Sequence, residues 1–294
     1  MKSAVQRAGW TLVAPAIVAI GVFFVLPVAA GLLLSLTDFD IYTLGSWANL
    51  RVVWLENYRT LVADALFWRA LANTVYFVVV GGSVSIAVSF GAALLLSAGA
   101  VRLRALWRTV FFVPVVTTVV AAAVVWRAWY HPRVGVLAAA FLAVGLQPID
   151  WLGDPRWAMP AIILFAVWKN FGFNMMIFVA ALESIPRVLY EAASVDGASR
   201  WQQFRTVTLP MLRPALGFVV LMTSIGYFQL FAEPYVMTQG GPAHATMSLV
   251  LLMYRSGFQW WNVGYGAAVA WVLFALLLVV TVLVTRVRAT EAQR

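Results

Sequence analysis

The sequence predicts an all-α polytopic membrane protein with six transmembrane helices, and two observations support this prediction. The composition is 63% hydrophobic and 11% charged, with a mean hydropathy of +0.90, whereas soluble domains hold about 25% charged residues. Several runs also reach the roughly 20 apolar residues that a helix needs to cross a bilayer. No connection between these runs is long enough to bury a core of its own, so residues 1–294 are expected to form one transmembrane domain.

The six predicted spans follow one another along the chain. The first begins after Lys2 and Arg7, as a signal peptide would, but its apolar run exceeds the roughly 7–15 residues of a signal peptide, so it is expected to be retained. The third contains Pro114, where a kink is expected because proline lacks a backbone N–H. The predicted ranges are about 10–36, 71–98, 106–129, 158–182, 214–233 and 264–287.

Basic residues predict the orientation, because loops rich in Lys and Arg tend to remain in the cytoplasm. With the N-terminus inside, the cytoplasmic side receives twelve of the twenty Lys and Arg residues and the outer side receives seven. Both termini and the connection 183–213 are then cytoplasmic. The expected location is the cytoplasmic (inner) membrane, with lipid around the bundle.

Composition also argues against several other classes of function. The chain has no cysteine, which excludes disulfides, thiolate catalysis and cysteine metal sites. Its two histidines, His131 and His244, lie far apart in predicted loops and indicate no metal site. The net charge of +9 is attributed to membrane orientation and not to nucleic-acid binding. A membrane enzyme is the less favoured alternative to a transporter, because the only nearby acid pair, Asp38 and Asp40, is explained more simply as the end of the first span. No catalytic residue is expected.

A polar segment interrupts the hydrophobic sequence between the fourth and fifth spans. Ser184 is expected to cap a helix that Pro186 opens. The helix should run to Asp196, and Gly197 should end it by adopting a left-handed backbone.

A second short helix is expected directly afterwards, over residues 199–206. Leu209-Pro210 is expected to stop this helix before the fifth span begins. By pattern alone, the resulting helix–turn–helix is either an ordinary solvated loop or a surface that docks a partner.

The segment contains Glu191-Ala192-Ala193, then Gly197, then Val207 and Leu209-Pro210. Their spacing resembles the EAA motif of ABC importer permeases. Three residues separate the alanines from the glycine, nine separate the glycine from the valine, and valine replaces isoleucine as the only departure. The resemblance extends over nearly the whole chain, and Ser184-Ile185-Pro186 is similar to the carbohydrate-uptake branch of that family.

The resemblance implies the fold of a type I ABC importer permease, and it implies partners. These are a second homologous permease, a homodimer of cytoplasmic ATPases and an extracytoplasmic solute-binding protein. The external loop with Gly240, Gly241 and Pro242 resembles a segment that would face the binding protein. The residues implied to couple to the ATPase are Tyr190, Glu191, Ala192, Ala193, Asp196, Gly197, Leu209 and Pro210.

The sequence offers no site for the ATP hydrolysis that such a system needs. A P-loop requires Lys after Gly, and the only lysines, Lys2 and Lys169, do not follow glycine. The chain is therefore expected to bind no cofactor and to depend on ATP used by its partner. A secondary transporter is disfavoured because the spans hold essentially one charge, Lys169, besides Glu233 at an outer end. A passive channel would leave the polar segment unexplained.

The solute is expected to pass near Lys169 in the fourth span. A charge at mid-bilayer costs about 2.5–3.5 kcal/mol, so this side chain should face an interior lined by protein or water. Asn170 and Asn174 lie one turn apart on a shared face, where they either contact solute or join helices.

The fifth span carries a similar stripe of side chains, and Gln229 and Glu233 should form an adjacent i, i+4 pair. Tyr227 is as well explained by core packing as by contact with solute. The resemblance favours a sugar, with another solute such as glycerol phosphate as the alternative. The candidate pathway residues are Thr118, Lys169, Asn170, Phe173, Asn174, Thr223, Tyr227 and Leu230.

Overall fold

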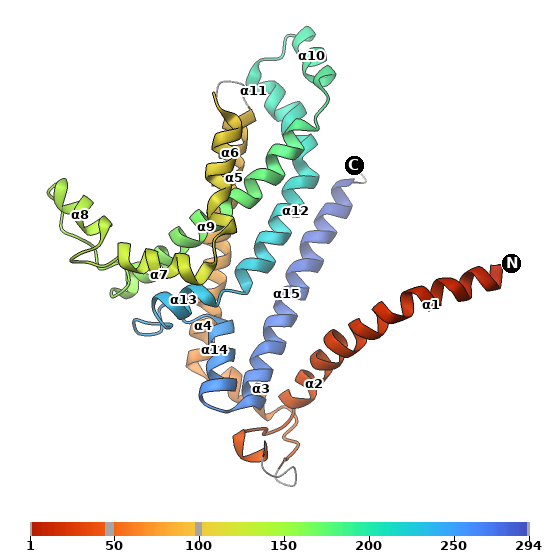
Figure 1. Ribbon diagram of the computed structural model, residues 1–294, viewed down its shortest axis with the longest axis vertical. Helices are drawn as coiled ribbons and strands as arrows, with labels where there is room; N and C mark the ends of the chain where they lie inside the picture. The colour runs from red at the N-terminus through yellow and green to blue at the C-terminus, as the bar shows by residue number, and fades with distance from the viewer. Residues whose placement is uncertain (1, 45–49, 98–101, 293–294) are drawn as a thin grey trace. The chain divides into compact units, whose positions relative to one another are not determined.

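The computed structural model describes residues 2–44, 50–97 and 102–292 (Figure 1). Within these ranges the chain is helical, and its only β-type pairing consists of the isolated bridges Thr37–Val52 and Asp40–Asn262. The all-α prediction is confirmed.

Fifteen α-helices are described. In the first half of the chain they are α1 (Lys2–Ile20), α2 (Leu26–Ser35), α3 (Glu56–Ala63), α4 (Ala65–Tyr76), α5 (Gly82–Ser97), α6 (Arg104–Val116), α7 (Val119–Trp129) and α8 (Val136–Ala143). In the second half they are α9 (Pro155–Glu183), α10 (Arg187–Val195), α11 (Arg200–Gln203), α12 (Leu209–Phe228), α13 (Ala232–Met237), α14 (Leu249–Tyr254) and α15 (Val263–Ala292). Wider π turns join three pairs of these helices without a break, namely η1 (Gly21–Val25), η4 (Phe77–Gly81) and η5 (Phe204–Thr208). The π turn η6 (Arg255–Gln259) extends α14 and ends before α15, and η2 (Ile41–Leu44) is a 3-10 turn.

In the part of the chain that the structure describes, five helical stretches are long and apolar enough to cross a membrane, and a bent pair raises the number to six if it counts as one span. Each predicted span has a counterpart among them, although the second begins earlier and the fifth is continuous with the segment before it. The stretches are Trp10–Ser35, Ala65–Ser97, Pro155–Glu183, Arg200–Met237 and Val263–Arg286, with Arg104–Val116 and Val119–Trp129 as the bent pair.

The third span differs from the prediction of one kinked helix over 106–129. Pro114 stays inside α6, and the chain turns at Thr117 and Thr118, whose backbones are extended. The Thr117 N–H and hydroxyl both donate to the Pro114 carbonyl oxygen, at 3.3 and 2.6 Å, which closes the last turn of α6. The axis of α7 then departs from that of α6 by 98°. Proline therefore precedes a break between two helices.

The chain divides into two compact units. The first comprises Met1–Phe67 and Leu252–Phe274. Inside it, the Asn57 amide donates to the carbonyl oxygens of Ser35 and Thr37, at 2.9 and 2.8 Å, and the Tyr265 hydroxyl donates to Asp64 at 2.6 Å. These bonds tie the polar connection after α2 to the helices of the same unit.

The second unit comprises Trp68–Leu251 and Ala275–Arg294 and holds the polar loop. Its longest helix, α9, packs against α5, α6 and α12. One core cluster surrounds Phe165 and Trp126, and another surrounds Phe178 and Met175. Within this unit α10 and α11 lie at the same end as the start of α6 (Figure 1).

Candidate functional site

The polar loop comprises residues 183–213, and its first helix, α10, begins later than the sequence predicts. Ser184 ends α9 instead of opening α10, and its hydroxyl donates to the Ala181 carbonyl oxygen at 2.8 Å. Pro186 is the cap that precedes α10. The expected role of Ser184 as an N-cap is therefore wrong, because the hydrophobic run of α9 continues as helix through Glu183.

The turn after α10 follows the prediction. Gly197 has a positive φ of 76°, and the N–H of Ala198 donates to the Ala193 carbonyl oxygen at 2.9 Å. This is the pattern in which a left-handed residue ends a helix. Ser199 then caps α11 through a capping box with Gln202.

The two arms of the loop are bonded to each other. The Gln203 amide donates to the Ser194 hydroxyl at 2.9 Å and to the Ala198 carbonyl oxygen at 3.1 Å. The hydroxyls of Tyr190 and Thr208 lie 2.9 Å apart in a hydrogen bond. The loop is thus an ordered element.

Leu209-Pro210 does not stop the second helix. The chain runs from α11 through η5 into α12, and the Leu209 N–H donates to the Phe204 carbonyl oxygen, five residues back. The wider π turn accommodates a proline, whose ring would otherwise clash with the carbonyl one α-turn earlier. The expected stop is therefore wrong, because Pro210 sits at the start of an α-segment that follows a π turn.

The coupling residues implied by the sequence lie together on this loop. Glu191, Ala192, Asp196 and Gly197 are exposed, while Ala193 and Tyr190 are half-buried, as is Pro210; Leu209 is exposed. Among the described residues Glu191 takes part in no ion pair. The loop therefore presents an exposed carboxylate without an ion pair among the described residues, next to the small side chains of Ala192 and Ala193.

A cavity of about 310 Å³ lies inside the second unit, between α9, α12 and the segments that flank them. Seven of the eight predicted pathway residues line it. The complete lining is Phe77, Val115, Lys169, Asn170, Phe173, Asn174, Met222, Thr223, Gly226, Tyr227, Gln229, Leu230 and Glu233.

Lys169 is 8% exposed, and its ammonium donates to the Val115 carbonyl oxygen at 3.1 Å. Glu233 lines the same cavity and attracts Lys169 electrostatically, although the two side chains form no ion pair within 4 Å. A buried cation is thus held by a carbonyl on one side and faces a carboxylate across the cavity.

The two asparagines have different roles. The Asn174 amide donates to the Thr223 hydroxyl at 2.9 Å and joins α9 to α12. The Asn170 amide donates to the Ala166 carbonyl oxygen of its own helix at 2.9 Å, which leaves its amide oxygen for the cavity. Asn174 and Thr223 are therefore helix-joining as well as lining.

Aromatic side chains supply flat walls. Tyr227 stacks on Phe77 with ring centroids 4.8 Å apart, and its hydroxyl has Ser85 and Asn170 as neighbours but no hydrogen bond of ordinary geometry. Phe173 is 49% exposed and lines the cavity from α9.

The outer end of the fifth span is not helical as predicted. The α12 helix ends at Phe228, and Phe231, with φ −141° and ψ −59°, lies outside the helical conformation before α13 begins. Gln229 and Glu233 are therefore not an i, i+4 pair on one helix, yet both reach the cavity, as does Leu230.

Thr118 is exposed at the helix break and is not among the lining residues. Val115, three residues earlier, lines the cavity in its place. Sequence reasoning missed Val115, Phe77 and Met222 because an apolar residue in an apolar span carries no signal that distinguishes a cavity wall from a lipid-facing side.

The loop around Gly240–Pro242 is tightly held. Gly240 is buried with a φ of 77°, the Gly241–Pro242 peptide is cis, and the Asn73 amide donates to the carbonyl oxygens of His244 and Met247, at 2.8 and 2.9 Å. The exposed members of this loop are its neighbours Gln239, Ala243 and His244.

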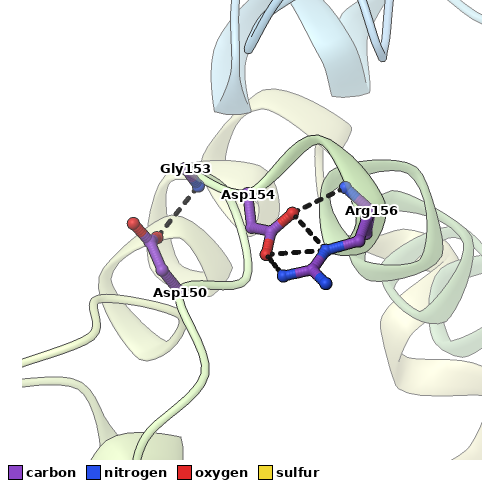
Figure 2. Close-up of polar contacts among 4 residues, drawn as sticks. All are labelled: Asp150, Gly153, Asp154 and Arg156. Carbon is purple, nitrogen blue, oxygen red and sulfur yellow. Dashed lines mark hydrogen bonds and ion pairs between the residues drawn. The ribbon is translucent and has the colours of Figure 1, made fainter.

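A second ordered turn precedes α9 (Figure 2). Asp150 accepts a hydrogen bond from the Gly153 N–H at 2.9 Å, and Asp154 caps α9 by accepting from the Arg156 N–H at 2.9 Å. The Arg156 guanidinium also donates to Asp154, which holds the pKa of that carboxyl below its usual range. The part of the chain that the structure describes contains no group of three or more His, Cys, Asp or Glu side chains suited to a metal ion.

Comparison with known proteins places this geometry in a family. Residues 87–290 match the family described as binding-protein-dependent transport system inner membrane component. The lactose transport system permease protein LacF of Rhizobium radiobacter is 38% identical over 94% of this chain and 92% of its own length. The trehalose/maltose transport system permease protein MalF of Thermococcus litoralis is 30% identical over 98% of this chain and 95% of its own.

A solved structure shares the fold. A chain of a bacterial alginate ABC transporter, in complex with a periplasmic protein that holds an alginate pentasaccharide, superposes with a TM-score of 0.82. The two chains are 21% identical, and the match covers 97% of this chain and 95% of the other. This chain is a multi-pass membrane protein and belongs to the family of binding-protein-dependent transport system inner membrane components.

Proposed function

We propose that this chain is one of two permease subunits of an ATP-driven, binding-protein-dependent sugar importer. It would form half of the translocation pathway and receive the work of ATP hydrolysis through the loop 183–213. The observation that carries this proposal is an ordered, exposed EAA-type loop whose Glu191 forms no ion pair within the described chain.

The loop suits docking on an ATPase for physical reasons. Ala192 and Ala193 allow another backbone to approach closely, and Glu191 can accept charge-assisted hydrogen bonds from a basic partner. Exposed apolar side chains, Val188 and Val195, flank them on the same helix. Such a surface matches the coupling role of Tyr190, Glu191, Ala192, Ala193, Asp196, Gly197, Leu209 and Pro210.

The proposed assembly contains a second homologous permease, two ATPase subunits that bind ATP, and an extracytoplasmic solute-binding protein. The alginate transporter, whose fold is shared, was solved with a periplasmic protein bound. The exposed residues beside Gly240, Gly241 and Pro242 would meet that protein, and both termini would lie in the cytoplasm.

A sugar is the solute that the cavity suits best. Hydrogen-bonding groups on Asn170 and Gln229 lie beside the flat faces of Phe173 and Tyr227, and sugars present hydroxyls next to apolar ring faces. The relatives named for lactose and for trehalose/maltose support the same solute class.

A test compares Glu191→Ala with the control Glu56→Ala, which removes another exposed glutamate on α3. Membranes containing the full transporter would be solubilised, and the ATPase retained with each tagged permease would be measured. Glu191→Ala should reduce ATPase retention and sugar uptake by about tenfold, the effect of losing one charge-assisted interaction of about 1.5 kcal/mol, whereas Glu56→Ala should leave both unchanged. Equal retention in the two variants would refute the docking role.

A further inference from the structure

Lys169 lies where the third span breaks, and we propose that its ammonium couples the cavity to the bend between α6 and α7. The proposal rests on the cavity being the solute pathway. Lys169 is a positioning residue that stabilises the bent form of the third span. Oxygen atoms of a bound solute compete with the Val115 carbonyl for the hydrogen bonds of its ammonium.

The first half of the span is fixed to α9. Gly172 of α9 approaches α6 so closely that an added Cβ would overlap the Phe111 carbonyl oxygen. An ion pair joins Arg108 of α6 to Glu183 of α9. Lys169 makes a third link to α6, through the Val115 carbonyl in its last turn.

The second half of the span packs on α9 and also on α13. On α9, the Trp126 ring contacts the rings of Phe165 and Trp168. The hydroxyl of Tyr130, which directly follows α7, donates to the Ala161 carbonyl oxygen at 2.8 Å. After the 98° bend, α7 packs against α13, and Trp126 of α7 belongs to the same core cluster as Met237 of α13. The α13 helix also carries Glu233 into the cavity. Both halves therefore contact α9, and only the half after the bend also packs on α13, the helix that carries Glu233 to the cavity.

The balance between the bent and the straighter form of the third span depends on the Val115 carbonyl. In an uninterrupted α-helix it would accept from the N–H of Val119, four residues on. In this structure Val119 is the first residue of α7, and the Lys169 ammonium donates to the Val115 oxygen instead.

The ammonium has three N–H donors and is attracted by Glu233 across the cavity. Solute hydroxyls that bridge Lys169 and Glu233 would draw the ammonium from Val115 and so favour a straighter span. A vacant cavity leaves Lys169 on Val115 and favours the bend.

Spin labels at Ala105→Cys and Ala128→Cys test this coupling, because both positions are exposed and the chain has no other cysteine. At 1.5 Å per residue, a straight helix would separate the two Cα atoms by about 35 Å, whereas a 98° bend reduces the separation to about 23 Å. Pulsed electron resonance would be recorded on the full transporter in lipid nanodiscs, without solute or nucleotide.

The parent should give the short distance. Lys169→Met should move the distribution toward the long distance, Lys169→Arg should restore the short one because it keeps the donor, and Glu233→Gln should remain short because the competing charge is gone. Leu164→Ala is the control, since Leu164 lies on α9 with 47% of its surface exposed and does not line the cavity, and it should match the parent.

A Lys169→Met distribution identical to that of the parent would overturn the proposal. If that variant fails to insert, Lys169→Leu, which is uncharged and has no hydrogen-bond donor, replaces it with the same expected shift. The measurement uses no solute, so a failure of sugar uptake would refute the proposed function while leaving the distance result to decide this inference separately.

Discussion

Gly197 is the residue on which the turn between α10 and α11 depends. Its φ of 76° falls in the left-handed region, and a Cβ built there would meet no heavy atom within 4 Å. Any penalty of substitution is therefore a backbone penalty, which makes the position a clean test of the loop's shape.

Gly197→Ala should disfavour the docked geometry by about 1–2 kcal/mol, the cost of a left-handed backbone in a residue with a Cβ. The affinity of the ATPase for the purified permease, measured by calorimetric titration, should fall by roughly 5- to 30-fold. Gly91→Ala is the control, since Gly91 lies in α5, where an added Cβ would meet no heavy atom within 4 Å and the backbone φ is not positive. Unchanged affinity for Gly197→Ala would argue against a role for the turn.

A substitution at Gly172 tests how closely α6 packs against α9. A methyl group there would overlap the Phe111 carbonyl of α6, so Gly172→Ala should destabilise the protein by about 1–3 kcal/mol, the usual cost of overpacking. Gly226→Ala, at a cavity position where a Cβ meets nothing within 4 Å, should be nearly neutral. Thermal unfolding in detergent would distinguish them, and equal midpoints would contradict the close approach of α6 to α9.

Seven of the eight residues proposed for the pathway line the cavity. Lys169, Asn170 and Asn174 could be predicted because a charged or amide side chain in an apolar span has to face an interior, whereas Thr223, Tyr227 and Leu230 came from helical spacing and from the family resemblance. The same reasoning could not predict the partners. Nothing in the sequence distinguishes Asn174, which bonds Thr223 on another helix, from Asn170, which bonds its own helix.

At the scale of elements, the bond between Asn174 and Thr223 links α9 to α12 across the cavity wall. Both side chains are buried in the protein, with 5% and 6% of their surface exposed, although both line the cavity. The link holds together two of the helices whose relative position shapes the pathway.

A double-mutant cycle with Asn174→Ala and Thr223→Ala should give a coupling energy of about 0.6 kcal/mol and no more than about 1.7, as for other hydrogen bonds between membrane helices. The unfolding free energy would be measured in mixed micelles. A cycle of Asn170→Ala with Thr223→Ala should give a value near zero, and similar values in the two cycles would contradict the assignment.

Local signals predicted which elements exist better than where they end. Gly197 ends α10 as expected because its left-handed backbone depends on one residue. Pro210 does not end a helix because the π turn η5 precedes it, and that turn is a property of several backbone bonds that no single residue announces.

At the scale of the whole molecule, the orientation remains a prediction from charge, and the cysteine-free chain makes it measurable. Val195→Cys, where the side chain is 89% exposed on α10, should react with an impermeant maleimide only in inside-out vesicles. Val134→Cys, where the side chain is 82% exposed before α8, should react only from outside intact cells. Labelling of Val195→Cys from the exterior would invert the proposed topology.

The six-span count could be predicted because apolar length is a property of composition along the chain. The 98° turn in the third span could not, because Pro114 predicts a kink near itself, whereas the extended pair Thr117 and Thr118 sets the bend.

The unbroken run from Arg200 to Phe228 has a mechanical consequence. Its 29 residues, in α11, η5 and α12, extend about 43 Å at 1.5 Å per residue, with Trp201 exposed at one end and Tyr227 in the cavity at the other. A displacement at the loop would therefore reach the cavity through one continuous helical run, because the helix does not break at Pro210. Inserting two glycines after Gln203 should preserve binding of the ATPase but uncouple its ATP hydrolysis from sugar uptake.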